Sequence, residues 1–597
     1  MPTLSDLQIL LIILLTILSL SIVLLWRILR PRYLQWRGVE TKDLSQQPNL
    51  TIEQPLQPPL RTVGSLEQNG NRRSAWIGTI LFILALSAYV LTRFVDLGSF
   101  PITFFADEAA PTVLAAELVE NGFRHEGAIL PTYFLNVDKY SLSVTVYMQL
   151  IPYLVFGKSV LVTRTVSVLA GLVGVLCICL MLKEIFRISL WWSGVVWVML
   201  SPAWFYHSRT ALEAPVASAL FASFLLAYLL YLYRSPRVFP LVVITAALSF
   251  YAYNPARVVI VASILLMAIS DRRYHWSNRK IIRGNWWVIL LCLLPYVRFF
   301  FQHPLAASDQ LLLLNSYWIQ EINLGQKLLR FLGELLRGLN PFYWYFPHEQ
   351  DLARHTMKGY GHILWIGLPF ALWGIYQAFK RRDVNAYRVL LIALISAPLG
   401  GALVQTVITR ALMMVVPLTL FTATGFSNLA HRLLQNRRAY VIAAFSLLLV
   451  GSGIGSVMMF DAIRNGPRWY QDYGLYGMQY GSPQVFEEIN KQLERAPDSR
   501  VIVTPYWANG TTMLARFFMS DLDRLWWGVA SELLEEDVDF GRQDLFVMLP
   551  AEYEQVIANE RLRSIELEEI LYLPDGKPGF YFARLDTAAG TDEPVVP

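Results

Sequence analysis

Apolar side chains in this chain gather in runs close to the length of about 20 residues that a membrane-spanning helix needs. Half of these runs contain no charged residue, and the polar residues collect between them. Two short runs flank Asn254-Pro255 and are either two helices or one broken helix. Twelve runs predict membrane helices, over residues 7–26, 76–96, 160–182, 189–206, 212–233, 238–253, 258–270, 286–301, 361–379, 387–406, 410–428 and 440–459.

Basic residues in the short connections predict the orientation, because cytoplasmic loops carry an excess of Lys and Arg. Four connections are strongly basic: 27–75, the one after 270, 380–382 and 432–438. All four fall on one side if the apolar stretch 140–156 does not cross the membrane. We therefore interpret 140–156 as an interfacial or re-entrant helix within one outer loop, residues 97–159.

The two ends of the chain differ from its middle. Residues 1–30 predict an extra N-terminal membrane helix, uncleaved because no basic residue precedes its apolar run. Residues 31–75 are polar and contain several prolines, which predicts a disordered cytoplasmic linker. Residues 76–460 form the predicted transmembrane domain. The tail from 468 holds 23 acidic and 11 basic residues, so the domain 461–597 is expected outside the cell membrane.

Helical and strand-like patterns alternate in this tail, which predicts a small α/β domain. Helices are expected at 483–494 and 511–519, and strands at 500–504, 544–549, 563–573 and 579–585. No catalytic motif or phosphate loop appears there, so we expect a binding or capping role.

Composition supports this organisation. Apolar residues make up 55% of the chain and charged residues 16%, against about 25% charged in soluble proteins. These values exclude a disordered chain, a coiled coil and a disulfide scaffold. The predicted fold class is an α-helical polytopic membrane protein of about 12 spans, 11 of them core, with a small C-terminal extracytoplasmic α/β domain.

The acidic pair Asp107-Glu108 follows the second span by about ten residues. Carboxylates beside an apolar surface are costly unless they have a partner or a function. Asp107 is either the N-cap of a helix that starts at Glu108, or a well-placed general base, and the two roles are compatible.

Arginines form the second group of polar residues on the predicted outer face. Arg209 and Glu213 are four residues apart and would share a helix face, either as a structural pair or with Arg209 facing an anionic ligand. Arginine binds two phosphate oxygens at once, although single arginines also snorkel to lipid head groups. Further candidates on this face are Lys139, Arg164, Tyr253, Arg257, Arg354, His355 and Arg410.

The long outer loop 302–360 contains apolar residues at a spacing of three to four. This pattern predicts a pair of amphipathic helices lying on the outer leaflet. We assign no metal ligand and no certain cofactor. A divalent metal stays open, since His348, beside Glu349, and His355 are either structural loop histidines or part of a metal site.

Together, a rigid carboxylate, several arginines and apolar walls at the outer interface suit sugar transfer from a polyprenyl phosphate. The phosphate leaving group is a weak base, so it needs no acid to protonate it, and one carboxylate base for the acceptor hydroxyl is sufficient. Basic residues would stabilise the charge that grows on the phosphate. Single displacement with inversion follows as the hypothesis.

Four stretches resemble the GT-C superfamily of membrane glycosyltransferases, in its aminoarabinose-transferase-like and protein O-mannosyltransferase-like branches. They are FFADEAAP, VDKYSLSVTVYMQLIPYLVFGKSVLVTRTVSVLAGLVGVL, SPAWFYHSRTALEA and TRALMMVVPLTLFTATG. The resemblance covers roughly residues 76–460, and its specificity comes from the order of short motifs. It implies an undecaprenyl- or dolichyl-phosphate sugar donor and an outward-facing cavity.

The resemblance also implies roles for single residues. Asp107 is the expected base, with Glu108 and Glu213 as partners. Tyr140-Ser141 departs from the family's usual Pro-Pro after Lys139, so contacts there are expected to differ. The expected phosphate or sugar ligands are Lys139, Arg209, Tyr253, Arg257 and Arg410.

Two other classes remain open. A lipid or solute transporter or flippase should carry charges near the middle of its spans and repeated broken helices. A non-catalytic scaffold would only present the tail. The sugar and the acceptor, whether lipid, glycan or protein, do not follow from the sequence, and no nucleic-acid partner is expected.

Overall fold

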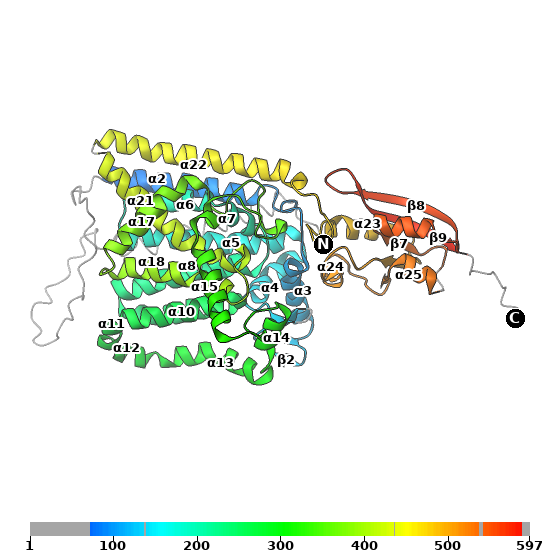
Figure 1. Ribbon diagram of the computed structural model, residues 1–597, viewed down its shortest axis with the longest axis horizontal. Helices are drawn as coiled ribbons and strands as arrows, with labels where there is room; N and C mark the ends of the chain where they lie inside the picture. The colour runs from blue at the N-terminus through cyan, green and yellow to red at the C-terminus, as the bar shows by residue number, and fades with distance from the viewer. Residues whose placement is uncertain (1–71, 137–138, 435, 537–540, 588–597) are drawn as a thin grey trace, which may run out of the picture. The chain divides into compact units, whose positions relative to one another are not determined.

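The computed structural model describes residues 72–136, 139–434, 436–536 and 541–587, and helices dominate it (Figure 1). The predicted helix 7–26 lies outside these residues. So does the predicted linker 31–75, except for residues 72–75, which begin α2. The first helices are α2 (Arg72–Phe94), α3 (Ala106–Glu120), α4 (Val144–Phe156), α5 (Val160–Leu180), α6 (Ser193–Met199), α7 (Pro202–His207), α8 (Glu213–Tyr233), α9 (Phe239–Ala252), α10 (Asn254–Ser270), α11 (Arg272–Ser277) and α12 (Arg279–Gly284). The next are α13 (Trp286–Gln302), α14 (Ala306–Leu313), α15 (Leu324–Leu339), α16 (Pro341–Tyr345), α17 (Leu368–Lys380), α18 (Asn385–Ser396), α19 (Leu399–Ala402), α20 (Ile408–Ala411), α21 (Val415–Leu433) and α22 (Arg437–Asn465).

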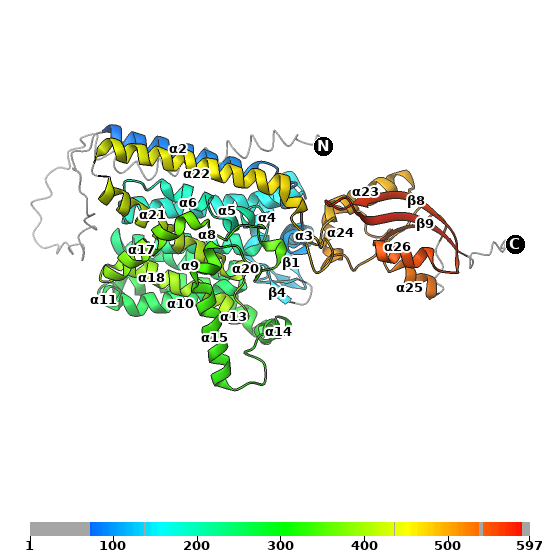
Figure 2. The same cartoon turned by 45° about the horizontal axis from the view of Figure 1, so that its top comes forward.

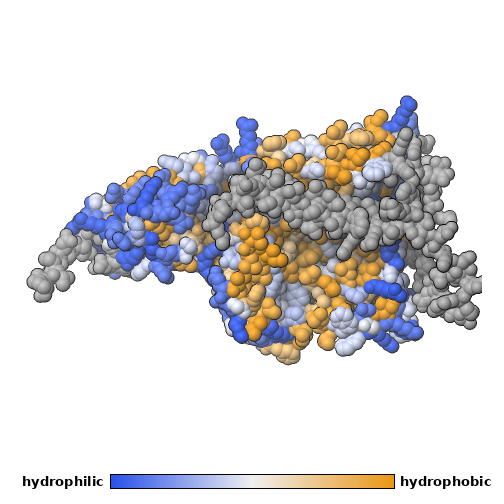
Figure 3. Space-filling view, turned by 180° about the vertical axis from the view of Figure 1, so that it is seen from behind, coloured by the Kyte–Doolittle hydropathy of each residue, from blue (hydrophilic) through white to orange (hydrophobic). Residues whose placement is uncertain are grey.

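Six helical segments among the described residues are long and apolar enough to cross a membrane, and a seventh if α13 and α14, bent by 76°, count as one span. They are 76–94, 160–185, 213–233, 385–402, 408–433 and 438–468. Shorter apolar helices lie between them, so the count of about twelve spans stays a prediction. The face in Figure 3 is hydrophobic over this bundle and hydrophilic over the C-terminal domain. The chain is an integral membrane protein, as its composition predicted.

One predicted span divides differently in the structure, and the runs beside Asn254-Pro255 follow one of their two predicted alternatives. The single span 189–206 is wrong: α6 ends at Met199, and α7 starts afresh after Ser201, whose side chain accepts a hydrogen bond from the Trp204 N–H. Pro202 at the first position of α7 has no N–H to lose there. The runs around Asn254-Pro255 form two separate helices, α9 and α10, which pack against each other.

Helix α21, which follows α20 in the chain, packs tightly against α17. A Cβ on Gly374 would lie 2.1 Å from the carbonyl oxygen of Phe421, and one on Gly425 would lie 2.0 Å from that of Phe370. Only glycine fits at such a contact, as at close helix pairs in other membrane proteins. The close approach therefore depends on both glycines.

The tail folds into an α/β domain. It contains α23 (Ser482–Arg495), α24 (Thr511–Phe518), α25 (Ala530–Glu535), α26 (Pro550–Ile557) and the strands β5 (Val501–Val503), β6 (Leu525–Trp527), β7 (Leu545–Met548), β8 (Leu562–Tyr572) and β9 (Pro578–Thr587). The sheet order is β6-β5-β7-β9-β8, with β5 parallel to β6 and β7, and β9 antiparallel to β7 and β8. The six elements predicted for the tail are confirmed, and β6, α25 and α26 are additional.

One face of this sheet shares an apolar core with α3. Val113 of α3 and Phe486 and Phe517 of the tail belong to the same buried cluster. The Ser482 hydroxyl donates to the Phe104 carbonyl over 2.9 Å, just before α3 begins. Arg516 and Glu117 form an ion pair farther along α3. The C-terminal domain therefore holds the helix that carries Asp107.

Candidate functional site

The acidic pair lies in the first turn of α3. The N-cap of this helix is Phe105, which makes no side-chain capping bond, so the prediction that Asp107 is the N-cap is wrong by two residues. Both carboxylates still lie beside the positive N-terminal end of the helix, where negative charge is favoured. Their environments differ sharply, because Asp107 is exposed and Glu108 is fully buried.

Glu108 forms a bidentate ion pair with Arg164 of α5. The distances are 3.0 Å from Nε to Oε2 and 3.2 Å from Nη2 to Oε1, and Oε2 also accepts from the Ala211 N–H. The remaining donors of Arg164 bind the backbone carbonyls of Leu97, Pro101 and Thr103. The polar atoms of both groups are occupied by hydrogen bonds within the protein, so the pair holds the loop before α3 in place.

Asp107 is fixed by a short hairpin of the outer loop. Strands β3 (Phe134–Asn136) and β4 (Lys139–Ser141) pair with Asn136 opposite Lys139. The buried Asn136 side chain donates from Nδ2 to Asp107 Oδ1 over 3.0 Å. The hairpin therefore orients one carboxylate oxygen and brings Lys139 next to the acid. Strands β1 (Arg124–His125) and β2 (Ala128–Ile129) form a second small hairpin in this loop.

Arg257 lies in the first turn of α10 and faces the same region. Its Cζ is 4.3 Å from the centre of the Tyr133 ring. Its buried Nε and Nη2 have no hydrogen-bond partner among the described residues. Buried charged donors are normally paired. An anion bound at Arg257 would supply the hydrogen-bond acceptors that these two nitrogens lack.

Electrostatic contacts join the other predicted residues to this group. Glu213, half-buried at the start of α8, accepts from the Leu142 N–H over 2.8 Å and lies within electrostatic range of Lys139, Asp107 and Arg257. Tyr253, between α9 and α10, lies within range of Arg410, Glu213 and Asp107. Two carboxylates thus face three cations, a balance that favours an anionic ligand.

Arg209 does not join this group. It lies in the turn between α7 and α8, and its five hydrogen bonds go to backbone carbonyls of Thr92, Arg93, Val95 and Phe100. These carbonyls lie at or just after the C-terminal end of α2, where backbone acceptors lack helical partners. The expected helix face shared with Glu213 is wrong, because α8 begins only at Glu213. Arg209 fixes the end of α2.

Arg354 and His355 approach Asp107 from the long loop 302–360. Arg354 donates from Nη1 to the carbonyls of Tyr476 and Gly477, over 3.3 and 3.0 Å. Burial lowers the pKa of Arg354, and the charge of Asp107 partly opposes this. The loop thereby connects the tail to the site.

His355 lies against a second buried histidine, His207 of α7, with ring centres 5.7 Å apart. Burial is the main cause that lowers the pKa of His355 well below its usual value, and the neighbouring His207 and Arg354 add to it. Burial also lowers the pKa of His207 to about 4. Both rings are therefore neutral at physiological pH.

A histidine–aspartate cluster forms elsewhere in this loop. His348, Asp351 and His362 offer three ligand atoms within 4.8 Å of one another. His362 Nε2 lies 2.9 Å from Asp351 Oδ2, and Asp351 Oδ1 accepts from the Ile408 N–H over 2.8 Å. Burial alone would raise the pKa of Asp351, but these hydrogen bonds and the charge of His362 hold it below its usual value. The cluster connects the loop to the start of α20, which carries Arg410, and its ligand types also suit a divalent transition metal.

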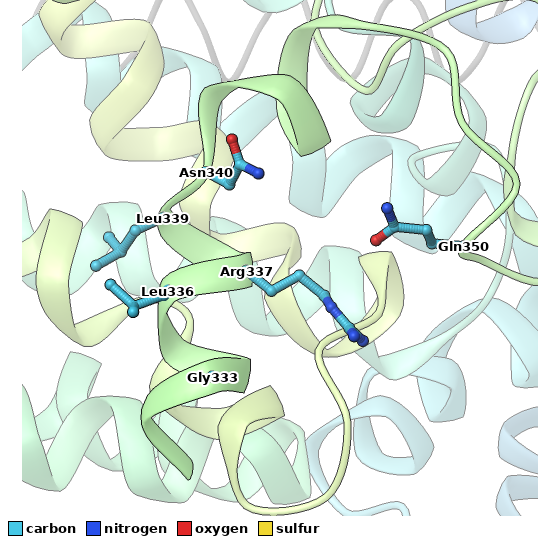
Figure 4. A pocket seen from close by; sticks show the side chains of 6 residues that line it. All are labelled: Gly333, Leu336, Arg337, Leu339, Asn340 and Gln350. Carbon is cyan, nitrogen blue, oxygen red and sulfur yellow. The ribbon is translucent and has the colours of Figure 1, made fainter. Parts of the chain in front are cut away.

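A hollow of about 530 Å³ lies beside α15 (Figure 4). It is lined by Gly333, Leu336, Arg337, Leu339, Asn340 and Gln350. A neighbouring hollow of about 480 Å³ reaches Gln405, whose carbonyl accepts a hydrogen bond from Arg410.

Figure 2 shows α15 projecting from the bundle. The predicted amphipathic helix pair corresponds to α14 and α15.

The sequence analysis missed Asn136 and Tyr133. A signal for the hairpin was present, because Asn and Asp between two runs rich in aromatic residues are typical of a tight turn. Nothing in the sequence indicates that Asn136 reaches Asp107, since the two lie 29 residues apart.

Comparisons with known proteins find solved structures of similar fold. No family model matches the chain, and no curated protein matches it. The structure of ArnT from Cupriavidus metallidurans in the apo state has a TM-score of 0.52 at 10% identity, covering 86% of this chain and 98% of that one. The same protein bound to undecaprenyl phosphate gives 0.52 at 9% identity, covering 85% and 98%.

A third match is the archaeal oligosaccharyltransferase AglB from Archaeoglobus fulgidus, in complex with an inhibitory peptide and a dolichol-phosphate. It has 12% identity and covers 85% of this chain and 74% of that one, but its TM-score of 0.46 is too low to carry an argument.

The buried ion pair gives a prediction for stability. Glu108→Gln or Arg164→Met should each lower the free energy of unfolding by about 3–5 kcal/mol, because each leaves a buried charge unpaired. Thermal unfolding in detergent measures this effect. Lys491→Gln, which breaks an exposed pair with Glu487, is the matched control and should leave the free energy of unfolding nearly unchanged. Equal effects of the core and control variants would contradict the structural role.

The chain thus shares the fold of ArnT, a membrane protein of the kind that the sequence resemblance predicted.

Proposed function

We propose that the protein is a membrane glycosyltransferase that moves a sugar from a polyprenyl-phosphate carrier to an acceptor at the extracytoplasmic face. Two observations carry the proposal: the carboxylate of Asp107 is exposed and oriented by Asn136, and the buried Nε and Nη2 of Arg257 have no hydrogen-bond partner among the described residues. Undecaprenyl phosphate bound to a protein of the same fold supports the choice of carrier.

The reaction would be a single displacement at the anomeric carbon. Asp107 takes the proton of the acceptor hydroxyl as the hydroxyl oxygen attacks the anomeric carbon. The bond between the anomeric carbon and the phosphate oxygen breaks, and its electron pair stays on the phosphate oxygen. The phosphate gains a negative charge as it leaves. Arg257, Lys139 and Arg410 stabilise that charge, so no acid has to protonate the leaving group. The product has inverted configuration.

Glu108 and Arg164 have a different role from the one their motif suggested. Their contacts are made entirely with the protein, so in this proposal they position α3 and the loop before it. Glu213 holds the end of β4 through the Leu142 N–H and balances the charge of the cations. Tyr253 would lie beside the donor, next to Arg410.

The transporter alternative has less support. Of the site residues, Asp107, Lys139 and Arg354 lie in loops or in a helix that is not a candidate span, and Glu213 is the first residue of its span. Charges in the middle of several spans would be expected of a solute pathway.

Replacing the proposed base tests the mechanism. Asp107→Asn should lower kcat by about 10²- to 10⁴-fold with little change in KM, because general-base catalysis contributes about this much. The assay follows release of radiolabelled sugar from a panel of polyprenyl-phosphate sugars to water or to a cell-envelope extract. Asp309→Asn, an exposed acid of α14, is the control and should keep full turnover.

Full turnover by a normally folded Asp107→Asn protein would refute the base. A product that retains the anomeric configuration would refute single displacement. If wild-type protein turns over no donor of the panel, the enzyme proposal itself fails.

The proposed orientation makes a separate prediction. Glu532 is exposed in α25 of the C-terminal domain. In intact cells, a cysteine introduced at Glu532 into a cysteine-free variant should react with a membrane-impermeant thiol reagent. A cysteine at exposed Arg272 should react only after lysis. The reverse pattern would overturn the extracytoplasmic placement.

A further inference from the structure

Five basic side chains lie together at the other end of α10 from the candidate site. This helix begins beside Tyr253 and Arg257 and ends at Ser270, about 25 Å away at 1.5 Å per residue. The short helices α11 and α12 follow it. They expose Arg272, Arg273, Arg279, Lys280 and Arg283. We call these five residues the basic turn.

The basic turn lacks counter-charges. No ion pair joins any of its five side chains to a carboxylate within the described part of the chain. The nearest acid along the sequence, Asp271, is buried and already occupied: Arg388 and Asn385 bind its Oδ1, and the Tyr228 hydroxyl donates to its Oδ2. The positive charge of the turn is therefore not neutralised by the protein.

The surroundings of the basic turn are those of a membrane interface. Three exposed tryptophans flank it, Trp276, Trp286 and Trp287. The helices on either side expose aliphatic side chains, such as Leu265 of α10 and Leu291 of α13. Tryptophan gathers at the level of lipid head groups, with aliphatic side chains at the level of the acyl chains. The five cations thus lie where phosphates of a leaflet lie.

Hydrogen bonds hold this surface rigid. His275 of α11 lies between two hydroxyls of α8, with Tyr228 Oη 3.1 Å from its Nε2 and Tyr231 Oη 3.0 Å from its Nδ1. Arg388 binds Asp271 and also donates to the carbonyls of Arg382 and Asp383. It thereby connects the basic turn to the exposed bases Lys380 and Arg382, beside a single exposed acid, Asp383. These bonds fix the backbone that carries the bases, which reduces the entropy cost when a ligand binds them.

We propose that the basic turn is a binding site for anionic phospholipid head groups of the adjacent leaflet. Arginine forks bind two oxygens of a phosphodiester at once, and the tryptophans pack against the glycerol backbone and upper acyl chains. Clusters of four to eight bases next to a membrane helix attract anionic lipid. A basic loop that only sets the orientation of the protein in the membrane needs no preference for one lipid. A measured preference for anionic lipid therefore distinguishes a binding site from an orientation signal. This inference is independent of the proposed function.

The test counts lipids on the full-length protein by native mass spectrometry. Protein from nanodiscs of about 30 mol% phosphatidylglycerol in phosphatidylcholine should retain the two lipids at a phosphatidylglycerol-to-phosphatidylcholine ratio at least about fivefold above their ratio in the bilayer. The variant Arg279→Gln/Lys280→Gln/Arg283→Gln should lose this enrichment, because it removes three of the five cations of the basic turn. All three side chains are exposed, so the fold should stay intact. Size-exclusion chromatography checks the fold.

The matched control is Lys491→Gln/Arg495→Gln/Lys577→Gln, which removes three bases from the C-terminal domain and should keep the enrichment. Retention without preference in the wild type, or equal enrichment in the triple variant of the basic turn, would overturn the proposal. So would displacement of the lipid by soluble glycerol 1-phosphate at millimolar concentration, which would assign the site to a free phosphate compound.

Discussion

The buried ion pair between Glu108 and Arg164 is the constraint on which the candidate site depends. It joins α3 to α5, and its remaining hydrogen bonds fix the loop between α2 and α3. A charge pair this deep is favourable only with near-ideal geometry and full hydrogen bonding, so the backbone around it has little freedom. Asp107, one residue away, inherits that rigidity while its own carboxylate stays exposed.

This arrangement separates two acids that are adjacent in the sequence. Glu108 is buried and holds the helix, whereas Asp107 stays exposed, as its proposed role as the base requires. The cations divide in the same way. Arg164 and Arg209 are saturated by protein oxygens, whereas the buried Nε and Nη2 of Arg257 find no hydrogen-bond partner in the described part of the chain. A reactive site needs both kinds of residue, because rigid groups keep the reactive ones in register.

Hydropathy and charge predicted the membrane architecture, the elements of the tail and most of the residues near Asp107. They did not predict which charges are structural, because that depends on contacts such as the one between Glu108 and Arg164, 56 residues apart. The error at Arg209 came from spacing alone. Pro215 was the missed signal, since proline favours the first turn of a helix and so marks the start of α8 near Glu213. Ser201-Pro202 marked the break before α7 in the same way.

Binding of undecaprenyl phosphate to the purified protein tests the central claim most directly, because it separates the anion site from the base. Wild-type protein and Asp107→Asn should bind with similar Kd, and Arg257→Gln should weaken binding by about tenfold or more, the equivalent of one charge-assisted hydrogen bond. Equal Kd values for all three proteins, or no saturable binding by the wild type, would contradict the assignment of this cluster as the carrier site.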